Sequence, residues 1–241
     1  TKRSYLTPVI LLLRKFHPKS EALKIYEKLN NEFRNDYMKR IDEQQKSEKE
    51  LDNWVKWSEL VEIREKLTDE AYLMKDQTFL KNLKQKKLLD YALISGLYTF
   101  QPPVRLDYNN MNIYYDKKLE ELPTNENYVL INKKEKMRII LNVYKTSKNY
   151  NQIILNTPAK LTKLIKFYLK FNKKILDGVT ENNLSKLISK VFTIGEKKVN
   201  LNLIRHIYIS NKVSLKTIEK NKKLSNAMGH SPQMQTGYIR L

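Results

Sequence analysis

The sequence predicts an α+β protein that is mostly helical and contains one small antiparallel sheet. Apolar residues recur at every third or fourth position before Gly96 and again after Pro158, which indicates amphipathic helices. Between these helical parts lie three short runs of β-branched and aromatic residues, each bounded by Asn or Lys, and such runs are typical of strands. The order of helices, sheet and helices favours an α+β body over alternating strands and helices.

Two long helices are expected before the sheet. The first runs from Ser20 to about Ile41, with Ser20 as its N-cap. The second runs from Gln77 to Ser95, with Gly96 as its C-cap, because glycine favours that position. Between them, Trp54 and Trp57 belong to a further apolar face. We expect these tryptophans to pack against a neighbouring helix rather than to stack on DNA bases, because tryptophan is usually largely buried.

The sheet is expected to be a three-stranded meander. Its strands are Tyr128 to Ile131, Met137 to Tyr144 and Gln152 to Leu155, and its last hairpin turn is Lys145 to Asn151. Helices are expected to return from Ala159 to Leu176, Asn183 to Phe192, Leu201 to Asn211, and Ser214 to Met228. We place a domain boundary near residue 70, which separates a helical N-terminal part with a linker, 1–70, from a larger domain, 71–241.

The composition favours a polyanionic partner. Lys and Arg number 46 against 26 Asp and Glu, so the net charge is +20 at pH 7. Nucleic acid is the first candidate and a membrane surface the second, which is weakened because no apolar run approaches the length of a transmembrane helix. The chain has no cysteine and three histidines. We therefore expect a soluble intracellular protein without disulfides, metal or cofactor, and the start at Thr1 is compatible with a fragment or processed product.

Five residues, in chain order, supply the side chains that tyrosine-mediated cleavage of a DNA phosphodiester requires: Arg105, Lys145, Arg205, His230 and Tyr238. Arginine donates two parallel hydrogen bonds to phosphate and stays charged, so Arg105 and Arg205 suit a clamp on the scissile phosphate. Pro102 and Pro103 are expected to seat the first turn of a helix and to place Arg105 near its start.

The other three residues would move protons or form the covalent bond. Lys145, at the end of a strand, suits a general acid for the leaving 5′ oxygen, although Lys148 remains an alternative. His230 would donate a hydrogen bond to phosphate and help to move the proton of the nucleophile. Tyr238 would be the nucleophile and would store the bond energy as a 3′-phosphotyrosine.

Each of these residues also has an ordinary structural interpretation. Arg105 could pair with Asp107, Arg205 could lie along an apolar helix stripe, and Lys145 could be a solvated lysine in a turn. Their joint order and spacing favours the catalytic interpretation. Further lysines between positions 160 and 174 are expected to form a solvated helix face that also contacts backbone phosphates.

Over residues 76–238 the chain resembles the tyrosine recombinases, the phage-type integrases, whose catalytic domain is shared with type IB topoisomerases. The motifs are Leu97 to Arg105, Tyr144-Lys145-Thr146, Leu203 to His206, and Met228 to Ser231 followed by Tyr238. The first motif is most similar to recombinases of large DNA viruses and related mobile elements. The resemblance implies the recombinase catalytic fold, a core-binding N-terminal domain, double-stranded DNA as partner, and a homo-tetramer on two DNA sites.

The chain departs from the family at Asn202. This position, three residues before Arg205, usually carries histidine or lysine in the family, and asparagine can donate a hydrogen bond but cannot act as a base. The resemblance therefore implies a catalytic set of Arg105, Lys145, Asn202, Arg205, His230 and Tyr238, with a weaker proton relay or a larger role for His230.

The expected function is site-specific DNA recombination or integration, in the nucleus or cytoplasm of a host cell or in a virion. Two alternatives stay open. The first has the same chemistry and is a type IB topoisomerase or a telomere resolvase. The second is a DNA-binding or packaging protein that keeps the fold and has lost the reaction, which Asn202 makes conceivable.

Overall fold

The computed structural model describes residues 2–43, 45–74, 83–133, 136–150, 152–213 and 220. The chain divides into two compact units, Thr1–Asp52 and Asn53–Leu241. The protein is mixed α+β and mostly helical, with one four-stranded sheet, so the predicted class is confirmed at this level. No helix within the described ranges is both long and apolar enough to span a bilayer.

The first unit is helical. It contains α1 (Lys2–Phe16), α2 (Glu21–Asp42) and most of α3 (Glu48–Asn53). The expected helix after Ser20 is confirmed as α2, and the Ser20 hydroxyl accepts a hydrogen bond from the backbone N–H of Leu23 at 3.2 Å, as an N-cap does. Helix α1 was not expected, because Pro8 lies inside it and interrupts its apolar pattern.

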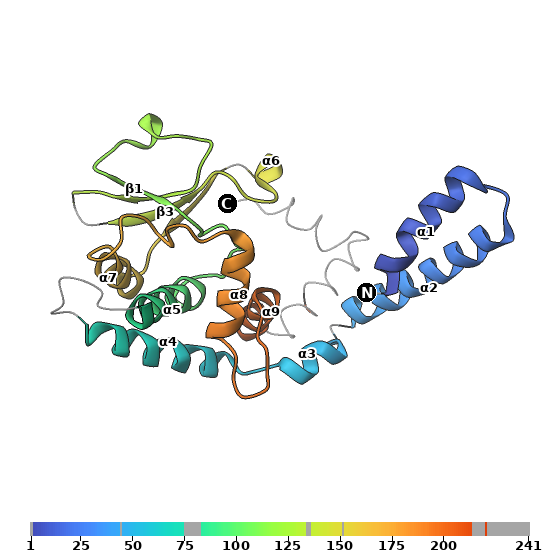
Figure 1. Cartoon of the computed structure of the whole chain (residues 1–241), viewed down its shortest axis with the longest axis horizontal. Coiled ribbons are helices and arrows are strands. Elements are labelled where there is room, and N and C mark those ends of the chain that lie inside the picture. Colours follow the sequence, from blue (N-terminus) through green and yellow to red (C-terminus); the bar gives the residue numbers. More distant parts are fainter. Residues whose placement is uncertain are drawn as a thin grey trace. The chain divides into compact units, whose positions relative to one another are not determined.

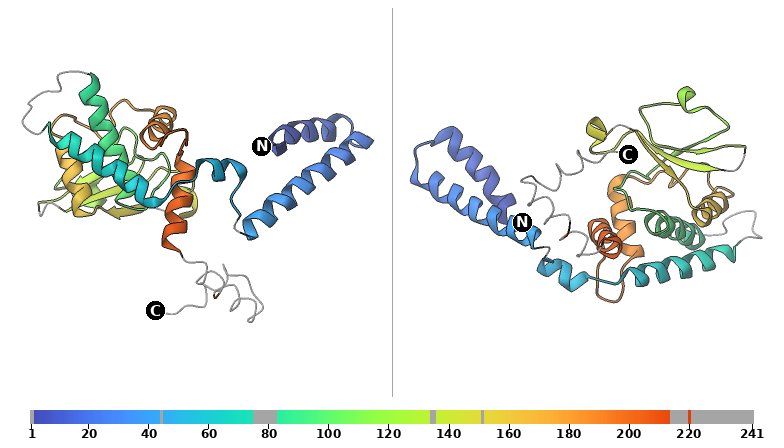
Figure 2. Two further views of the ribbon diagram at one scale, coloured as in Figure 1. Left: turned by 90° about the horizontal axis from the view of Figure 1, so that it is seen from below. Right: turned by 180° about the vertical axis from the view of Figure 1, so that it is seen from behind.

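The second unit is built around α5 (Leu83–Thr99). This helix packs along α4 (Trp57–Tyr72) and also contacts α7 (Ala159–Tyr168) and α8 (Glu181–Val191). Figures 1 and 2 show the sheet on one side of α5 and α7, and α4 on the opposite side of α5. Every residue from Ala92 to Thr99 is buried, so the C-terminal half of α5 lies at the centre of this unit. The boundary between the compact units lies after Asp52. Helix α4, which the sequence assigned to the N-terminal part, thus belongs to the second unit.

The sheet has four strands, β1 (Asn112–Tyr115), β2 (Tyr128–Ile131), β3 (Met137–Leu141) and β4 (Ile153–Asn156), in that order. The prediction of a three-stranded antiparallel meander is corrected in two respects. A fourth strand, β1, pairs in parallel with β2, whereas β2, β3 and β4 are antiparallel. The connection from β1 to β2 contains a short 3₁₀ turn, Leu119–Glu121, and returns the chain to the same end of the sheet, which makes the parallel pairing possible.

The two faces of the sheet belong to two apolar clusters. Val129 and Ile139 are fully buried in the large core that includes α5 and α7, whereas Tyr128 and Ile140 belong to a smaller cluster with Leu122 on the other face. This alternation follows the two-residue period of a strand. The loop that carries Leu122 thus covers the face of the sheet that the helices leave open.

Several predicted boundaries change in the structure. Gly96 lies inside α5, which ends at Thr99, and α7 ends at Tyr168 rather than at Leu176. The expected turn at 145–151 contains a short helix, α6 (Ser147–Tyr150). The helix expected to start at Pro102 and Pro103 is not present; the residues from there to Asn110 are irregular and lead into β1. The helices expected at 183–192 and 201–211 are confirmed as α8 and α9 (Leu201–Lys212), and the helix expected from Ser214 to Met228 lies outside the described residues.

Gly96 is expected to be intolerant of a larger side chain. A Cβ atom at this position would lie 2.5 Å from Cδ2 of Leu164, a fully buried residue of α7. We expect Gly96→Val to lower the free energy of unfolding by about 1–3 kcal/mol, the usual effect of overpacking a core, as measured by urea denaturation. In the Leu164→Ala background, where the neighbouring side chain is shorter, the same Gly96→Val change should lower the free energy of unfolding by less. Equal stability of Gly96→Val and the wild type would contradict the close packing.

Candidate active site

Three of the predicted site residues line one cavity in the second unit. Arg105, Lys145 and Asn202 all border a cavity of about 720 Å³, together with Asp107, Glu181 and Asn200. Arg105 comes from the irregular segment after α5, Lys145 from the segment between β3 and α6, and Asn202 from the first turn of α9. Residues that are far apart in the sequence therefore meet here, and they include two positively charged side chains and two side-chain amides.

A buried tyrosine fixes the backbone at Arg105. The hydroxyl of Tyr98, a fully buried residue of α5, donates a 2.8 Å hydrogen bond to the carbonyl oxygen of Arg105. The Tyr98 ring packs edge-to-face against Tyr108 with ring centroids 5.3 Å apart, and the Tyr108 hydroxyl accepts a bond from Gln101. Burial raises the pKa of Tyr98 well above its usual value, so its hydroxyl stays protonated and remains a donor. The backbone on which Arg105 stands is thus held by the core.

Asn127 joins the Arg105 segment to the Lys145 segment. Its Nδ2 donates to the carbonyl oxygens of Asp107, at 3.2 Å, and of Val143, at 2.8 Å. Its Oδ1 accepts from the backbone N–H groups of Asn142 and Val143, both at 2.8 Å. Asn127, which lies immediately before β2, therefore bridges the two loops that carry Arg105 and Lys145.

Replacing Asn127 with alanine should loosen both loops. We expect Asn127→Ala to lower the free energy of unfolding by about 1–3 kcal/mol, because backbone groups of Asp107, Asn142 and Val143 lose their partners. Thermal unfolding measures this change. Asn127→Asp is the matched variant, since it keeps the acceptor and loses the donor to Asp107 and Val143; an unchanged melting temperature for Asn127→Ala would show that this bridge does not hold the loops.

The N-terminus of α9 faces the cavity. Asn200 is its N-cap, and Oδ1 of Asn200 accepts a hydrogen bond from the backbone N–H of Leu203 at 3.0 Å. Asn200, Leu201 and Asn202 all line the cavity. Because the first turn of a helix carries unpaired N–H groups and partial positive charge, this end of α9 adds to the positive potential of Arg105 and Lys145.

Helix α9 is anchored on the other side by aromatic packing. Trp57 of α4 and Tyr208 of α9 meet edge-to-face with ring centroids 5.2 Å apart, as expected for a tryptophan that packs a helix against a neighbour. Before α9, Lys197 donates through Nζ to the carbonyl oxygen of Trp54 at 3.0 Å, and the backbone N–H of Lys198 donates to Asn53 at 2.7 Å. Trp57 thus packs against the helix that carries Asn202 and Arg205, as predicted, whereas Trp54 packs against the core and contacts the segment before α9 through its backbone carbonyl.

Two carboxyl groups also border the cavity. The pKa of Asp107 is raised, first by its burial and then by the negative charge of Glu181, while the nearby positive charge of Arg105 acts in the opposite direction. Asp107 therefore takes up a proton at a higher pH than an exposed aspartate, and its protonation makes the cavity more positive. The charge of Arg105 therefore acts on Asp107, but the ion pairs of the described residues do not include one between these two side chains. In the described ranges, no group of three or more His, Cys, Asp or Glu side chains could hold a metal ion.

The remaining predicted residues have different placements. Arg205 is half-buried and lies one helical turn beyond Asn202 on α9, so both occupy the same side of the helix, but Arg205 is not among the described residues that line the cavity. Lys148 lies on α6 and also does not line it, which favours Lys145 of the two lysines. His230 and Tyr238 lie outside the described residues.

Sequence reasoning missed the residues that support the site. Tyr98, Asn127 and Asn200 hold the segments that carry Arg105, Lys145 and Asn202. Only Asn200 had a local signal, because asparagine directly before a helical pattern is a usual N-cap. The contacts of Tyr98 and Asn127 depend on the tertiary fold.

Comparison with known proteins gave no match, whether the chain was compared with family models, with curated proteins or with solved structures. The chemistry of the cavity is therefore inferred from the residues that line it. One guanidinium, one ammonium, a side-chain amide and a helix N-terminus all favour a bound anion, and Asp107 and Glu181 oppose it when they are ionised.

Proposed function

We propose that this protein breaks and rejoins DNA strands through a tyrosine nucleophile and thereby carries out site-specific recombination or integration. The observation that carries the proposal is the shared cavity of Arg105, Lys145 and Asn202. The sequence predicts Arg105 and Lys145 as site residues from their chemistry, and the resemblance to tyrosine recombinases implies Asn202. Their convergence supports the resemblance to tyrosine recombinases and the recombinase catalytic fold, while the net charge of +20 supports double-stranded DNA as the partner.

In the proposed reaction, the phenolic oxygen of Tyr238 attacks the scissile phosphorus in line with the 5′ oxygen. The bond from phosphorus to the 5′ oxygen breaks as the bond to the tyrosine forms, which leaves a 3′-phosphotyrosine and a free 5′ hydroxyl. Lys145 gives its proton to the departing oxygen, and His230 receives the proton of the phenol. Rejoining is the reverse attack by a 5′ hydroxyl, so it needs no ATP.

The arginines and the asparagine would stabilise the transition state. Arg105 and Arg205 donate hydrogen bonds to the non-bridging oxygens, where negative charge increases during the attack. Asn202 donates a further hydrogen bond from its amide and cannot take up a proton. By the same resemblance, four copies of the chain assemble on two DNA sites, so that each strand is exchanged between two duplexes.

The test is a covalent adduct with a nicked DNA substrate. A pool of duplexes with randomised sequence and a nick close to the cleavage position releases a short fragment on cleavage, so the protein stays attached to the DNA. We expect the wild type to form an adduct that resists denaturation and Tyr238→Phe to form none, because phenylalanine has no oxygen nucleophile. Denaturing gel electrophoresis with labelled DNA measures both.

Tyr115→Phe is the matched control, since Tyr115 is an exposed tyrosine of β1 and should retain the wild-type adduct. An adduct of equal yield in Tyr238→Phe would contradict the assigned nucleophile. Relaxation of supercoiled DNA that lacks any recombination site would favour the topoisomerase alternative.

A second candidate function is a DNA-binding or packaging protein with little or no strand cleavage. Two observations favour it: Asn202 cannot act as a base, and Asp107 and Glu181 place negative charge in the same cavity as Arg105 and Lys145. This alternative predicts salt-dependent binding to duplex DNA by both the wild type and Tyr238→Phe, with no adduct in either.

A further inference from the structure

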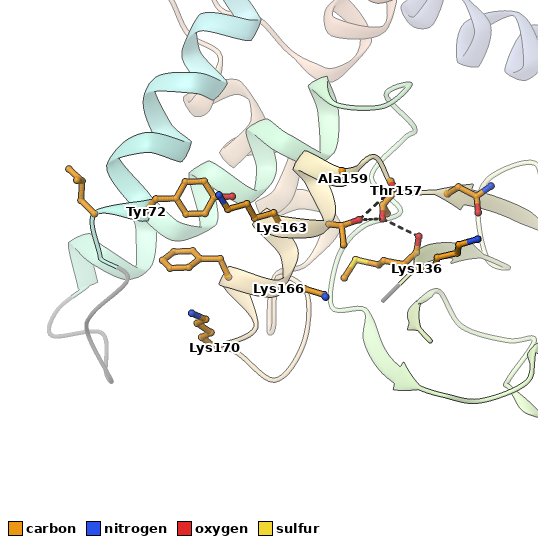
Figure 3. A pocket seen from close by; sticks show the side chains of 12 residues that line it. Tyr72, Lys136, Thr157, Ala159, Lys163, Lys166 and Lys170 are labelled. Atoms are coloured by element: carbon orange, nitrogen blue, oxygen red, sulfur yellow. Dashed lines mark hydrogen bonds between the residues drawn. The ribbon is translucent and has the colours of Figure 1, made fainter. Parts of the chain in front are cut away.

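A second cavity among the described residues is a groove that lies apart from the candidate active site. Its volume is about 1180 Å³, and its described lining shares no residue with the cavity of Arg105. The groove is formed by the end of α4, the start of β3, the end of β4 and the exposed side of α7 (Figure 3). We call it the α7 groove.

The α7 groove is strongly basic. Lys163, Lys166 and Lys170 lie on α7 and just beyond its end, at helical spacings of three and four residues, and Lys136 comes from the residue before β3. None of the described residues that line the groove is Asp or Glu. Figure 3 shows the labelled lysines distributed along the groove rather than gathered at one point. The charge pattern is therefore complementary to an extended acidic ligand.

The groove also contains apolar surface. Leu73 is 82% exposed, and Tyr72 packs edge-to-face against Phe167 with ring centroids 5.1 Å apart. An exposed leucine beside two aromatic rings is a surface that gains free energy when an apolar side chain covers it. A ligand that offered only charge would leave this gain unused.

Two lysines lie over the aromatic rings. The Lys163 ammonium is 5.2 Å from the centre of the Tyr72 ring, and the Lys170 ammonium is 5.7 Å from the centre of the Phe167 ring. Each ammonium therefore covers one face of its ring, which reduces the aromatic surface on which a nucleic-acid base could stack. This arrangement leaves Leu73 and the ring edges for aliphatic contacts, and it disfavours an aromatic base as the apolar part of the ligand.

The floor of the groove is preorganised. The Thr157 hydroxyl donates to the carbonyl oxygen of Met137 at 3.0 Å, and the backbone N–H of Thr157 donates to the same oxygen at 3.0 Å. The hydroxyls of Thr157 and Thr162 are 2.6 Å apart, which ties β4 to α7. A groove that is already formed needs little ordering when it binds a ligand.

We propose that the α7 groove binds an acidic polypeptide segment of a partner protein that carries large aliphatic side chains. The segment's carboxylates meet the lysines, and its aliphatic side chains cover Leu73 and the neighbouring rings. The sequence alone predicted backbone phosphate as the contact of these lysines. The groove favours a peptide instead, because a phosphate backbone has no apolar side chain to cover Leu73.

The test compares two labelled peptides of equal charge by fluorescence anisotropy with the full chain. One peptide alternates Glu with Leu, and in the other Ser replaces Leu. We expect the Leu peptide to bind more tightly than the Ser peptide. We expect Leu73→Ser to lower the affinity for the Leu peptide by about tenfold, because one buried aliphatic contact is lost. Lys163→Gln and Lys166→Gln should weaken both peptides, and added salt should do the same.

Tyr115→Ser and Lys117→Gln are matched controls, because both residues are exposed at the end of β1 and neither lines the groove; they should leave both peptides unaffected. Equal binding of the two peptides, with competition by duplex DNA and no effect of Leu73→Ser, would overturn the proposal and identify a phosphate-binding surface. No binding of either peptide at low salt would also overturn it. The adduct assay is independent, since Leu73 is not part of the candidate active site.

Discussion

Arg105→Ala is expected to lower the rate of covalent adduct formation by about 10²–10³-fold, the usual effect of removing one donor that stabilises charge in a transition state. Arg105 lies in the cavity with Lys145 and Asn202, on a backbone held by Tyr98. Its guanidinium would contact the phosphate where negative charge increases during the reaction, whereas many other basic residues contribute to binding. Affinity for duplex DNA should therefore fall by less than about tenfold, because one phosphate contact among several is lost.

Two variants make this prediction specific. Arg105→Lys keeps the charge but loses the two parallel hydrogen bonds, so its rate should lie between those of the wild type and Arg105→Ala. Arg138→Ala removes an arginine from β3, outside the cavity, and should leave the rate near that of the wild type. Single-turnover rates of adduct formation and anisotropy titrations with DNA measure the two quantities. If Arg105→Ala reduced binding and rate by the same factor, Arg105 would serve binding alone.

Lys145→Ala should have a comparably large effect. A general acid contributes about 10²–10⁴-fold to rate, because the 5′ oxygen leaves poorly as an unprotonated alkoxide. Lys148→Ala, which changes a lysine of α6 that does not line the described cavity, should stay within a few-fold of the wild type. The same single-turnover assay compares the two variants. The reverse result, a slow Lys148→Ala and a fast Lys145→Ala, would move the general acid to α6.

Helices were predictable from the sequence where their signals are local. The N-cap at Ser20 and the apolar period that follows it determine α2 without reference to the rest of the chain. Gly96 was misinterpreted for the opposite reason. A glycine at the end of an apolar pattern is typical of a C-cap, but this glycine allows α5 and α7 to approach closely at Leu164, and that neighbour is distant in the sequence.

The sheet was harder to predict at its edge. β1 has only four residues, Asn112–Tyr115, and its run of β-branched and aromatic residues, Ile113 to Tyr115, is shorter than those of the predicted strands. It becomes a strand because it pairs in parallel with β2, after a connection that covers the outer face of the sheet with Leu122. Such pairing is a property of the tertiary structure and leaves little trace in a short window.

In the candidate site, too, some residues were predictable from the sequence and others depend on tertiary contacts. The chemical types and the order of Arg105 and Lys145 indicated a shared site, and the family resemblance added Asn202; all three line one cavity in the structure. Asn127 was missed because its role depends on two loops that meet only after folding. Asp107 was expected beside Arg105 only as a structural alternative, and the carboxyl group of Glu181 in the same cavity was not expected; together they add negative charge to the site.

The central claim is that the cavity of Arg105, Lys145 and Asn202 is where the phosphodiester bond breaks. The most direct measurement uses a nicked substrate in which sulfur replaces the 5′ bridging oxygen of the scissile phosphate. A thiolate leaves without a proton, so the substitution removes the need for a general acid. We predict that it restores Lys145→Ala to within about tenfold of the wild type and leaves Arg105→Ala slow. A Lys145→Ala variant that remains as slow with sulfur as with oxygen, or equal rescue of both variants, would contradict the assignment.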